Sequence, residues 1–324
     1  MATIDVIIPC YGYGRFLEQC VDSVLTQDGP DLRVLILDDA SPDETPEVAD
    51  MLIRKDRRVS CIRHPSNRGH IATYNEGLDW ASADFTLLLS ADDWILPGAF
   101  VRAITVMEAD ASVGFVHGGA IEHYEGEDLV DRANPGPPWL VQDSETFLGE
   151  CRYGNPVATC TAVVRTALQK RIGGYRAELP HSGDLEMWMR FAAHGSVGRV
   201  NVNQGVYRRH ARNMSIEYGR SPLLDLRQRK AAIDFFLQAD SDRFPDPGAV
   251  RKMLRRGLAE SAMYRAAGSP DHFSETMRFA ASIDPAISHT LAWKKQHIKR
   301  WLGPTICSRI SAIRRRGLDS RVDA

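Results

Sequence analysis

The chain has 324 residues, of which 44% are hydrophobic and 25% are charged, and its net charge is −2. This is ordinary globular composition, and the length suits one large α/β unit with an appendage. The charge is uneven, because residues 289–324 carry nine Lys and Arg against two Asp and leave the rest of the chain net acidic. A basic tail on an acidic body indicates an anionic partner for the tail.

The six cysteines show no CxxC pair and no metal-finger spacing. In a chain of this length, they are typical of reduced thiols in a cytosolic protein. Residue 1 leads directly into a strand-like run, and no apolar stretch approaches the roughly 18–20 residues that span a bilayer. We therefore expect a cytoplasmic protein, soluble or peripheral on the inner face of the membrane.

Short apolar runs alternate with helix-like stretches over the first 120 residues. The runs predict strands at 4–8, 34–37, 59–63, 85–89 and 114–117. Strands that alternate with helices predict an α/β fold with a doubly wound, mostly parallel sheet. Ser41 and Glu44 form a capping-box pattern with Pro42 at the first helical position, which predicts a helix from there to about Lys55.

The second half of the chain is less regular. Residues 124–142 are polar and rich in Gly and Pro, which predicts a loop. A helix is expected over His181–His194, and residues from 221 onward form amphipathic helices with breaks at prolines. We therefore divide the chain into an α/β domain, 1–218, and a helical C-terminal region, 219–324.

Two acidic pairs follow predicted strands, Asp38 with Asp39 and Asp92 with Asp93. Ligands of parallel α/β sheets bind at the carboxyl ends of the strands. A carboxylate there can accept hydrogen bonds from a base or a ribose, and a pair can hold Mg²⁺ or Mn²⁺ together with substrate phosphates. The alternative is that both pairs only form turns or caps before the next helix.

Asp184 and a later basic cluster are further candidates. Asp184 opens an amphipathic helix, where it would be either a general base or an acid that favours the helix dipole. Arg208, Arg209 and His210 would either bind phosphate or form a solvated charge run.

Five segments resemble, in order, the motifs of the inverting glycosyltransferases of family 2, which have the GT-A fold. They lie within roughly residues 3–216 and read VIIPCYGYGRFLEQCVDSVLTQ, LILDDASPDET, NRGHIATYNEGLDWASADFTLLLSADDW, IGGYRAELPHSGDLEMWMRFAAHG and VYRRHARNMS. The resemblance implies that domain 1–218 binds a nucleotide sugar, with UDP or dTDP as the nucleotide, and transfers the sugar to an acceptor hydroxyl. The implied acceptor is a saccharide or a lipid-linked saccharide in cell-surface polysaccharide or glycolipid biosynthesis.

The resemblance also implies roles for single residues. The implied nucleotide site consists of Pro9, Tyr11, Asp38, Asp39, Arg68, Asp92, Arg208 and His210. The implied ligands of Mn²⁺ or Mg²⁺ are Asp92 and Asp93, and the implied catalytic base is Asp184. The residues implied on the acceptor side are Gly174, Tyr175 and Trp188.

Two positions depart from the family pattern. Ser90 stands where many members have an aspartate two places before the metal aspartate, and Gly183 precedes Asp184 where a glutamate is common. Ser90 keeps open a non-catalytic relative that only binds nucleotide sugars. The rival enzyme class is a metal-dependent nucleotidyltransferase, whose Gly-rich, Lys- or Arg-bearing signature after the first strand is poorly matched by residues 10–15.

The basic tail interleaves aromatic and aliphatic residues with Lys and Arg over residues 291–316. Two interpretations fit this pattern. The tail would lie on an anionic membrane surface, or it would pack on the catalytic domain with its charges in water. We expect no nucleic-acid partner, because no nucleic-acid-binding motif accompanies the charge.

Overall fold

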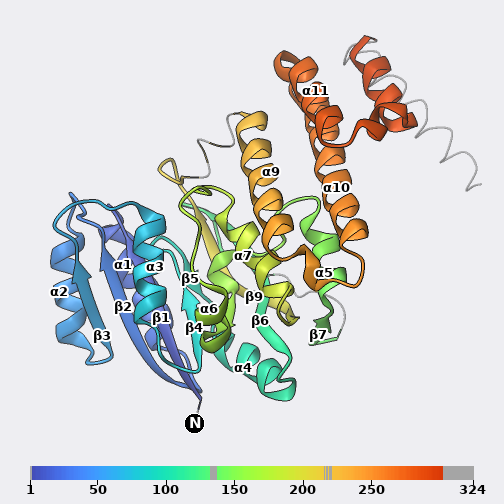
Figure 1. Ribbon diagram of the computed structural model, residues 1–324. Helices are drawn as coiled ribbons and strands as arrows, with labels where there is room; N and C mark the ends of the chain where they lie inside the picture. The colour runs from blue at the N-terminus through green and yellow to red at the C-terminus, as the bar shows by residue number, and fades with distance from the viewer. Residues whose placement is uncertain (1, 132–136, 215, 217, 219–220, 302–324) are drawn as a thin grey trace, which may run out of the picture.

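The computed structural model describes residues 2–131, 137–214, 216, 218 and 221–301. Its strands are β1 (Thr3–Cys10), β2 (Asp31–Asp38), β3 (Val59–Arg63), β4 (Phe85–Leu88), β5 (Trp94–Ile95), β6 (Val113–Tyr124), β7 (Trp139–Gln142), β8 (Val163–Arg165) and β9 (Ser196–Arg209). Its helices are α1 (Gly14–Leu25), α2 (Thr45–Lys55), α3 (His70–Trp80), α4 (Ala99–Ala109), α5 (Ser144–Cys151), α6 (Thr166–Ile172), α7 (Gly183–Ala192), α9 (Pro222–Ala239), α10 (Pro247–Gly268) and α11 (Phe273–Ile283). The strands form one sheet in the order β3-β2-β1-β4-β8-β6-β9-β5, with β7 paired to β9 (Figure 1).

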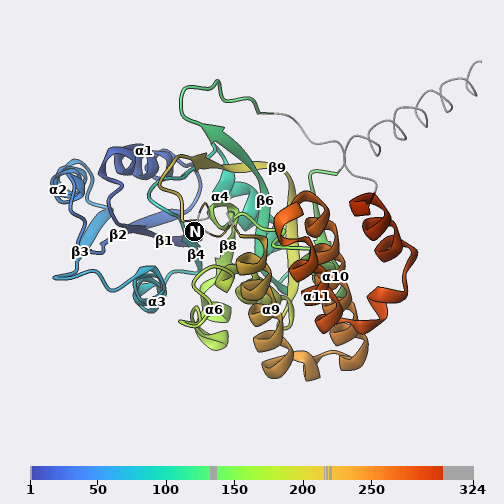
Figure 2. The same ribbon diagram turned by 90° about the horizontal axis from the view of Figure 1, so that it is seen from above.

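The first half of the sheet is parallel, as predicted. Strand β1 lies between β2 and β4, and β3 lies beyond β2. Helices α1 and α2 cover one face and α3 covers the other (Figure 2). Four residues of β1 are fully buried, namely Ile4, Val6, Ile7 and Ile8, which explains the apolar run that only Asp5 interrupts.

The second half of the sheet is mixed. Strand β8 is antiparallel to both β4 and β6, and β5 and β7 are antiparallel to β9. Strands β6 and β9 run parallel over almost their whole length, with register shifts around His117 and Gly119. The prediction of a loop over 124–142 was therefore partly wrong, because β7 forms within it and pairs with β9.

The capping-box prediction at Ser41 was also wrong. Helix α2 begins at Thr45, where Asp43 accepts hydrogen bonds from the Thr45 backbone N–H (3.2 Å) and hydroxyl (2.6 Å). The Ser41 hydroxyl instead accepts a hydrogen bond from the Gly12 N–H (3.0 Å) in the loop after β1. A long-range partner therefore replaced the local cap that the sequence pattern indicated.

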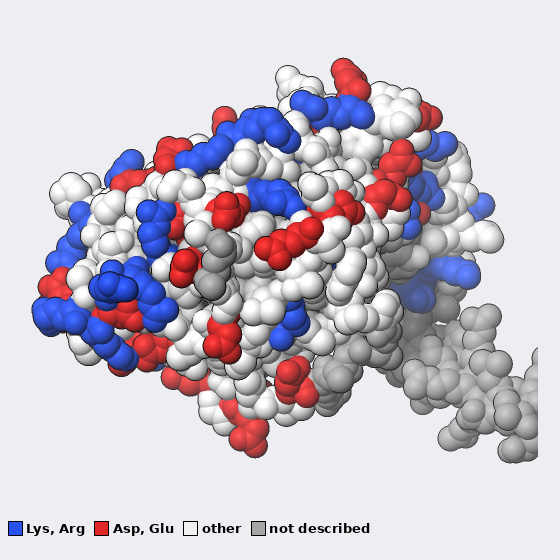
Figure 3. Space-filling model, turned by 90° about the horizontal axis from the view of Figure 1, so that it is seen from below, with Lys and Arg blue, Asp and Glu red and all other residues white. Residues whose placement is uncertain are grey.

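The C-terminal region is helical, as expected, and lies on the β6–β9 side of the sheet (Figure 2). Helix α9 contacts α7, and α10 contacts α5. A further helical stretch covers 291–301, and the rest of the basic tail lies outside the described residues. Within the described part of the chain, no helix is both long and apolar enough to cross a membrane. On the face shown in Figure 3, Lys and Arg alternate with Asp and Glu instead of forming one continuous basic surface.

A buried carboxylate ties the start of β1 to the connection before β4. Asp5 is 0% exposed and accepts hydrogen bonds from Arg33 (Nε 2.8 Å, Nη2 2.7 Å) and from the backbone N–H groups of Ser82 (2.7 Å) and Ala83 (2.9 Å). Burial alone would raise the pKa of Asp5, but these donors lower it below its ordinary value. Asp5 is therefore charged and fully paired at neutral pH.

We expect Asp5→Ala to lower the free energy of unfolding by about 2–3 kcal/mol, because it leaves the Ser82 and Ala83 N–H groups without their acceptor and removes the ion pair with Arg33. Chemical denaturation measures this loss. Asp84→Ala is the control, since Asp84 bonds only Thr3 in an exposed position, and its loss should be about 1 kcal/mol or less. Equal losses in the two variants would contradict this account of Asp5.

Candidate active site

A cleft of about 1390 Å³ opens at the carboxyl ends of β1, β2 and β4 and continues to α7, β6 and β9. Seven of the residues implied by the family motifs line it, namely Pro9, Tyr11, Asp39, Asp92, Asp93, Tyr175 and Asp184. The cleft therefore joins both acidic strand ends to the start of α7, although these segments are far apart in the sequence.

Asp39 organises the loop that follows β3. Its Oδ1 accepts hydrogen bonds from the Arg68 N–H (2.8 Å) and pairs with His64 Nδ1 (2.7 Å), and its Oδ2 accepts from the Gly69 N–H (2.9 Å). Burial would raise the pKa of Asp39, but the bonds from His64, Arg68 and Gly69 lower it below its ordinary value. Asp39 is thus an ionised group at the nucleotide end of the predicted site.

Two neighbours of Asp39 lie outside the cleft. Asp38 is 0% exposed and accepts hydrogen bonds from the Ser41 N–H (2.9 Å) and from Arg63 Nε (3.1 Å), so it ties β2 to β3 behind the cleft wall. The Arg68 side chain pairs with Glu76 on α3. Both charges have partners within the chain, and contact of either side chain with the nucleotide stays a prediction.

The second acidic pair lies in a turn after β4, where the Asp93 N–H donates to Ser90 O (3.0 Å). Asp92 Oδ2 pairs with His210 Nε2 (3.1 Å) and accepts from Asn213 Nδ2 (3.3 Å). Asp93 Oδ1 accepts from the Arg208 N–H (2.9 Å). Burial, and then repulsion from Asp92, raises the pKa of Asp93 well above its ordinary value.

The acidic pair fits only one kind of metal site. The part of the chain that the structure describes contains no group of three or more His, Cys, Asp or Glu arranged to hold a metal ion. The hydrogen bonds of Asp92 and Asp93 occupy one oxygen of each carboxylate. Mg²⁺ and Mn²⁺ commonly take one or two carboxylates and complete their shells with substrate phosphates and water. The pair therefore suits a cation that binds together with a diphosphate.

Arg208 is buried beside the acidic pair and does not line the cleft. Its guanidinium lies 4.4 Å from the centre of the Phe16 ring and 4.5 Å from that of Trp94. Its Nε donates to Asp92 O (2.8 Å), and its Nη2 donates to Gln19 (2.5 Å). Two of its three guanidinium nitrogens therefore have partners within the chain, and contact of Arg208 with a diphosphate stays a prediction.

The other basic residues of this segment lie closer to the cleft. His210 packs against the rings of Tyr13 (5.3 Å) and Phe16 (5.2 Å) next to Asp92, but it does not line the cleft. Arg209 and Arg212 do line it. Arg212 was not singled out from the sequence, although it lies within the last resembling motif. Arg209 pairs with Glu122 and Arg212 donates to Gly12 O (2.6 Å), so both cations are held in the cleft wall by partners of their own.

Asp184 lies at the first turn of α7, on the wall of the same cleft. Its Oδ1 accepts a hydrogen bond from the Leu185 N–H (2.8 Å), and its Oδ2 accepts from Asn155 Nδ2 (2.7 Å). Burial raises the pKa of Asp184 above its ordinary value, and the Leu185 N–H, His181 and Asn155 offset only part of this effect. A carboxylate with a raised pKa is suited to accept a proton.

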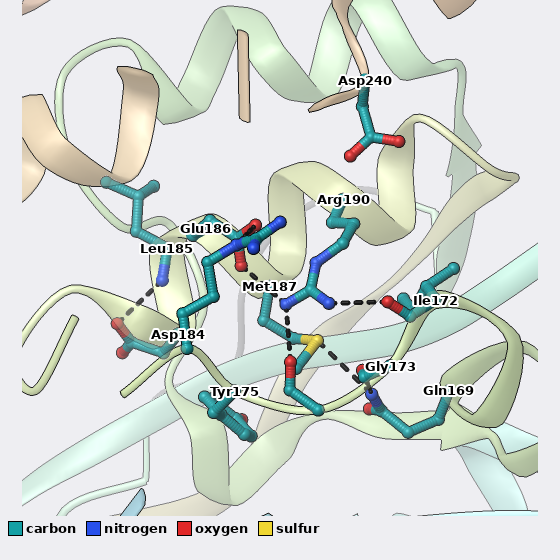
Figure 4. Close-up of polar contacts among 12 residues, drawn as sticks. Gln169, Ile172, Gly173, Tyr175, Asp184, Leu185, Glu186, Met187, Arg190 and Asp240 are labelled. Carbon is teal, nitrogen blue, oxygen red and sulfur yellow. Dashed lines mark hydrogen bonds and ion pairs between the residues drawn. The ribbon is translucent and has the colours of Figure 1, made fainter. Parts of the chain in front are cut away.

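A buried ion cluster holds the loop before α7 (Figure 4). Glu186 is 0% exposed and accepts hydrogen bonds from Arg176 Nε (2.9 Å) and Arg190 Nη2 (2.7 Å). Arg190 also donates to the backbone carbonyls of Ile172 (2.7 Å) and Gly174 (2.9 Å). The glutamate one turn into α7 therefore serves the scaffold and fixes the loop that borders the cleft.

The three residues implied on the acceptor side have different positions. Tyr175 lines the cleft, and its backbone exchanges two hydrogen bonds with the Asn75 side chain (2.7 and 2.9 Å). Gly174 packs against Asn75 so closely that a Cβ would lie 2.3 Å from its side-chain oxygen. Trp188 is buried and stacks on Phe115 (5.1 Å) in the core. Only Tyr175 is therefore placed to meet a ligand.

Sequence reasoning missed several polar residues of the site. Asn155 bonds the predicted base, Asn213 bonds Asp92, and His64 bonds Asp39. Each lies well away in sequence from the carboxylate that it contacts, or in a loop without periodicity. The position of Asn155 between Gly154 and Pro156 is a weak signal of an ordered turn and says nothing of its partner.

Residues 5–170, about half of the chain, match the family model described as Glycosyl transferase family 2. The chain belongs to this family of glycosyltransferases.

Several curated proteins are similar to the chain. An uncharacterized protein of Mycobacterium tuberculosis is 28% identical over 64% of the chain and 67% of its own length. The GalNAc(5)-diNAcBac-PP-undecaprenol β-1,3-glucosyltransferase of Campylobacter jejuni is 30% identical over 45% of the chain and 46% of its own length. The UDP-Glc:α-D-GlcNAc-diphosphoundecaprenol β-1,3-glucosyltransferase WfaP of Escherichia coli is 24% identical over 66% and 80%. The chain thus spans less than half of the Campylobacter enzyme.

Solved structures share the GT-A fold with the chain. Staphylococcus aureus TarS 1–349 in complex with UDP-GlcNAc has a TM-score of 0.62 and 16% identity, covering 92% of this chain and 79% of that one. The mannosyltransferase PcManGT of Pyrobaculum calidifontis, in complex with GDP-Man and Mn²⁺, has a TM-score of 0.50 and 17% identity, covering 92% and 86%. At these identities, the likeness concerns the fold alone.

We expect Asn155→Ala to raise the pKa of Asp184 further, because the amide N–H stabilises the charged form of the carboxylate. A carboxyl ¹³C NMR titration measures this pKa, and Asp184→Asn identifies the resonance. Asn203→Ala, which removes a surface bond to Asp131, is the control and should leave the titration unchanged. An unchanged or lowered pKa in Asn155→Ala would contradict the geometry described here.

Proposed function

We propose that this glycosyltransferase is inverting and transfers a sugar from a UDP- or dTDP-sugar to an acceptor hydroxyl, with Asp184 as the catalytic base. One observation carries the proposal. Asp184, the Asp92–Asp93 pair and Asp39 line a single cleft. Asp184 would be the base, Asp92 and Asp93 would bind the cation and diphosphate, and Asp39 would bind the nucleoside. A nucleotidyltransferase would have no evident use for Asp184 at this position.

The nucleoside would bind at the carboxyl ends of β1 and β2. The Tyr11 side chain is 48% exposed and lines the cleft, so its ring is available to stack on a base. Pro9 lines the same wall. Asp39 would accept a hydrogen bond from the imide N–H of uracil or thymine, which is why we favour UDP and dTDP.

The diphosphate would lie beside Asp92 and Asp93. These two carboxylates would hold Mn²⁺ or Mg²⁺, which supplies neutralisation of the charge that develops on the departing diphosphate. Arg209 and Arg212 would add charge-assisted hydrogen bonds from the cleft wall. His210, which is hydrogen-bonded to Asp92, would keep that carboxylate oriented.

Asp184 would take the proton of the acceptor hydroxyl as its oxygen attacks the anomeric carbon. The bond from this carbon to the diphosphate breaks on the opposite face, so a single displacement inverts the anomeric configuration. A covalent alternative through cysteine is disfavoured, because burial raises the pKa of Cys10 to about 12 and that of Cys160 well above its ordinary value. Both thiols line the cleft but are neutral near pH 7.

A lipid-linked saccharide is the acceptor class that we propose. The names of the Campylobacter and Escherichia relatives both specify a sugar acceptor linked to undecaprenol through a diphosphate. Such an acceptor lies at a membrane surface, so the enzyme must work close to that surface.

The helical stretch 291–301 offers a means of reaching an anionic membrane. Leu291, Ile298 and Trp301 are 74%, 55% and 85% exposed. By helical spacing they share one side with Lys294 and Lys295, whereas Trp293 packs on the core. Basic amphipathic helices with tryptophan bind the interface of anionic bilayers. We propose this role for the basic tail, of which residues 302–316 lie outside the described part.

We expect wild type with Mn²⁺ to hydrolyse a UDP- or dTDP-sugar slowly in the absence of acceptor. Asp184→Asn should lower this rate about 10²–10⁴-fold, since the base is lost, while UDP still binds. Measurement of released UDP or dTDP and of UDP affinity separates these effects, and Asp79→Asn, at an exposed carboxylate, is the control. Full activity in Asp184→Asn would refute the base assignment, and release of pyrophosphate from a nucleoside triphosphate and a sugar phosphate would favour the nucleotidyltransferase.

We expect the full chain to float with vesicles that contain phosphatidylserine, and to do so less at high salt, because salt screens its lysines. Replacement of Leu291, Ile298 and Trp301 together by glutamate should abolish flotation. The matched control is Tyr264→Glu, at a 58% exposed residue on α10. If the triple variant floats as well as wild type, residues 291–301 do not bind the membrane.

A further inference from the structure

A buried histidine lines the cleft on strand β6. His117 is 3% exposed, and neither ring nitrogen makes a hydrogen bond of ordinary distance and angle with any residue that the structure describes. A buried polar group without a partner is costly, and folded proteins contain few of them. An unpaired imidazole in the wall of a cleft therefore points to a ligand that completes its hydrogen bonds.

The pairing of β6 with β9 is irregular at His117, where this part of the cleft lies. His117 lies opposite Arg199 and Gly119 lies opposite Asn203, so β9 contains two extra residues across this step. Such a bulge bends a strand and redirects its side chains, and bulges often occur next to active sites. The next two residues of β6, Gly118 and Gly119, also line the cleft and place no side chain beside the imidazole.

The same face of β6 leads to the proposed base. Phe115, two residues before His117, packs against the imidazole (5.9 Å between ring centres) and stacks on Trp188 (5.1 Å). Trp188 lies one helical turn after Asp184 on α7. His117 therefore lies on the α7 side of the cleft, which carries the group that would take the proton from the acceptor.

The chemistry of His117 restricts the ligand. Burial, and then repulsion from Arg199, lowers the pKa of His117 to about 4, and the Gly118 backbone partly opposes this shift. At neutral pH the ring is uncharged, so one nitrogen donates a hydrogen bond and the other accepts one. A hydroxyl group can meet either nitrogen, whereas a phosphate or carboxylate can use only the donor. The combination favours a polyhydroxylated, uncharged ligand.

We propose that His117 forms a subsite for an uncharged sugar residue of the acceptor, in which a ring nitrogen bonds a hydroxyl group of that sugar. This inference rests on the proposed function, because it assumes that the acceptor approaches from the side of Asp184. Val157 and Ala158, which line the same cleft, supply apolar surface for the C–H groups of the sugar ring. His117 is thus a specificity-determining residue for the acceptor.

Two substitutions separate the hydrogen bonds of His117 from its packing. His117→Phe keeps a ring against Phe115 and Phe147 but has no polar atom, so we expect its melting temperature to equal or exceed that of wild type. His117→Gln keeps one donor and one acceptor. The probes are methyl α-N-acetylglucosaminide and methyl β-glucoside, titrated by saturation-transfer NMR into protein loaded with UDP and Mn²⁺.

We expect at least one glycoside to bind wild type, to bind His117→Phe about tenfold more weakly or worse, and to bind His117→Gln with intermediate affinity. UDP affinity should be the same in all three proteins. Equal glycoside binding by His117→Phe, or no glycoside binding by UDP-loaded wild type, would overturn the subsite. The same holds if His117→Phe loses affinity for UDP-glucose relative to UDP, since His117 would then contact the donor sugar. Failure of wild type to bind UDP would instead count against the proposed function itself.

Discussion

The clamp that residues 208–213 place on the acidic pair is the interaction on which the site depends. The Arg208 N–H bonds Asp93, its guanidinium bonds Asp92 O, and Asn213 bonds the Asp92 carboxylate. Two adjacent buried carboxylates repel each other, and burial also disfavours their charge. The clamp offsets part of both costs, because the Arg208 and Asn213 N–H groups bond the carboxylates and the Arg208 charge lies close by. Without the clamp, burial of both carboxylates in the turn after β4 would be unfavourable.

The clamp also decides how the cleft is assembled. It attaches the end of β9 to the end of β4, although the bonded residues are separated by 115 positions in the sequence. The β6–β9 part of the sheet is thereby brought against the parallel part, where Asp39 orders its own loop. The opposite wall is fixed independently, by the buried pair of Glu186 and Arg190 beneath the loop before α7. The acidic pair and Asp184 therefore face the same cleft because two separate sets of polar contacts hold its two walls. One is the clamp of residues 208–213, and the other is the ion pair of Glu186 and Arg190.

The parallel half of the fold could be predicted from the sequence because its strands are buried on both faces, which leaves a continuous apolar run in β1 and β2. The second half could not, since β7 and the bulge of β9 opposite His117 depend on pairing between distant strands and leave no periodicity of their own. Among the site residues, the type of chemistry was predictable but the orientation was not. Asp38 and Asp39 are adjacent and alike, and only the positions of Arg63 and His64 decide which of them faces the cleft.

The same reasoning applies to Arg208 and Arg212. Both belong to one basic segment, yet Arg208 is held between two aromatic rings and Arg212 reaches the cleft. His117 left no signal in sequence either, because a buried histidine in an apolar strand is usually a satisfied core residue. Its missing partners become visible only when the hydrogen bonds of the folded chain are known. Contacts between residues far apart in the sequence, rather than residue type, therefore decide which side chains support the fold and which ones line the cleft.

We propose that one cleft binds the nucleotide, the cation and the acceptor in fixed relation to Asp184. A crystal structure of the enzyme with UDP and Mn²⁺ tests it most directly. We predict uracil beside Tyr11 and Asp39, and the cation bonded to both the diphosphate and at least one of Asp92 and Asp93. The Asp184 carboxylate should face the free end of the diphosphate across the cleft. Nucleotide bound outside this cleft, or a cation that contacts neither aspartate, would contradict the account.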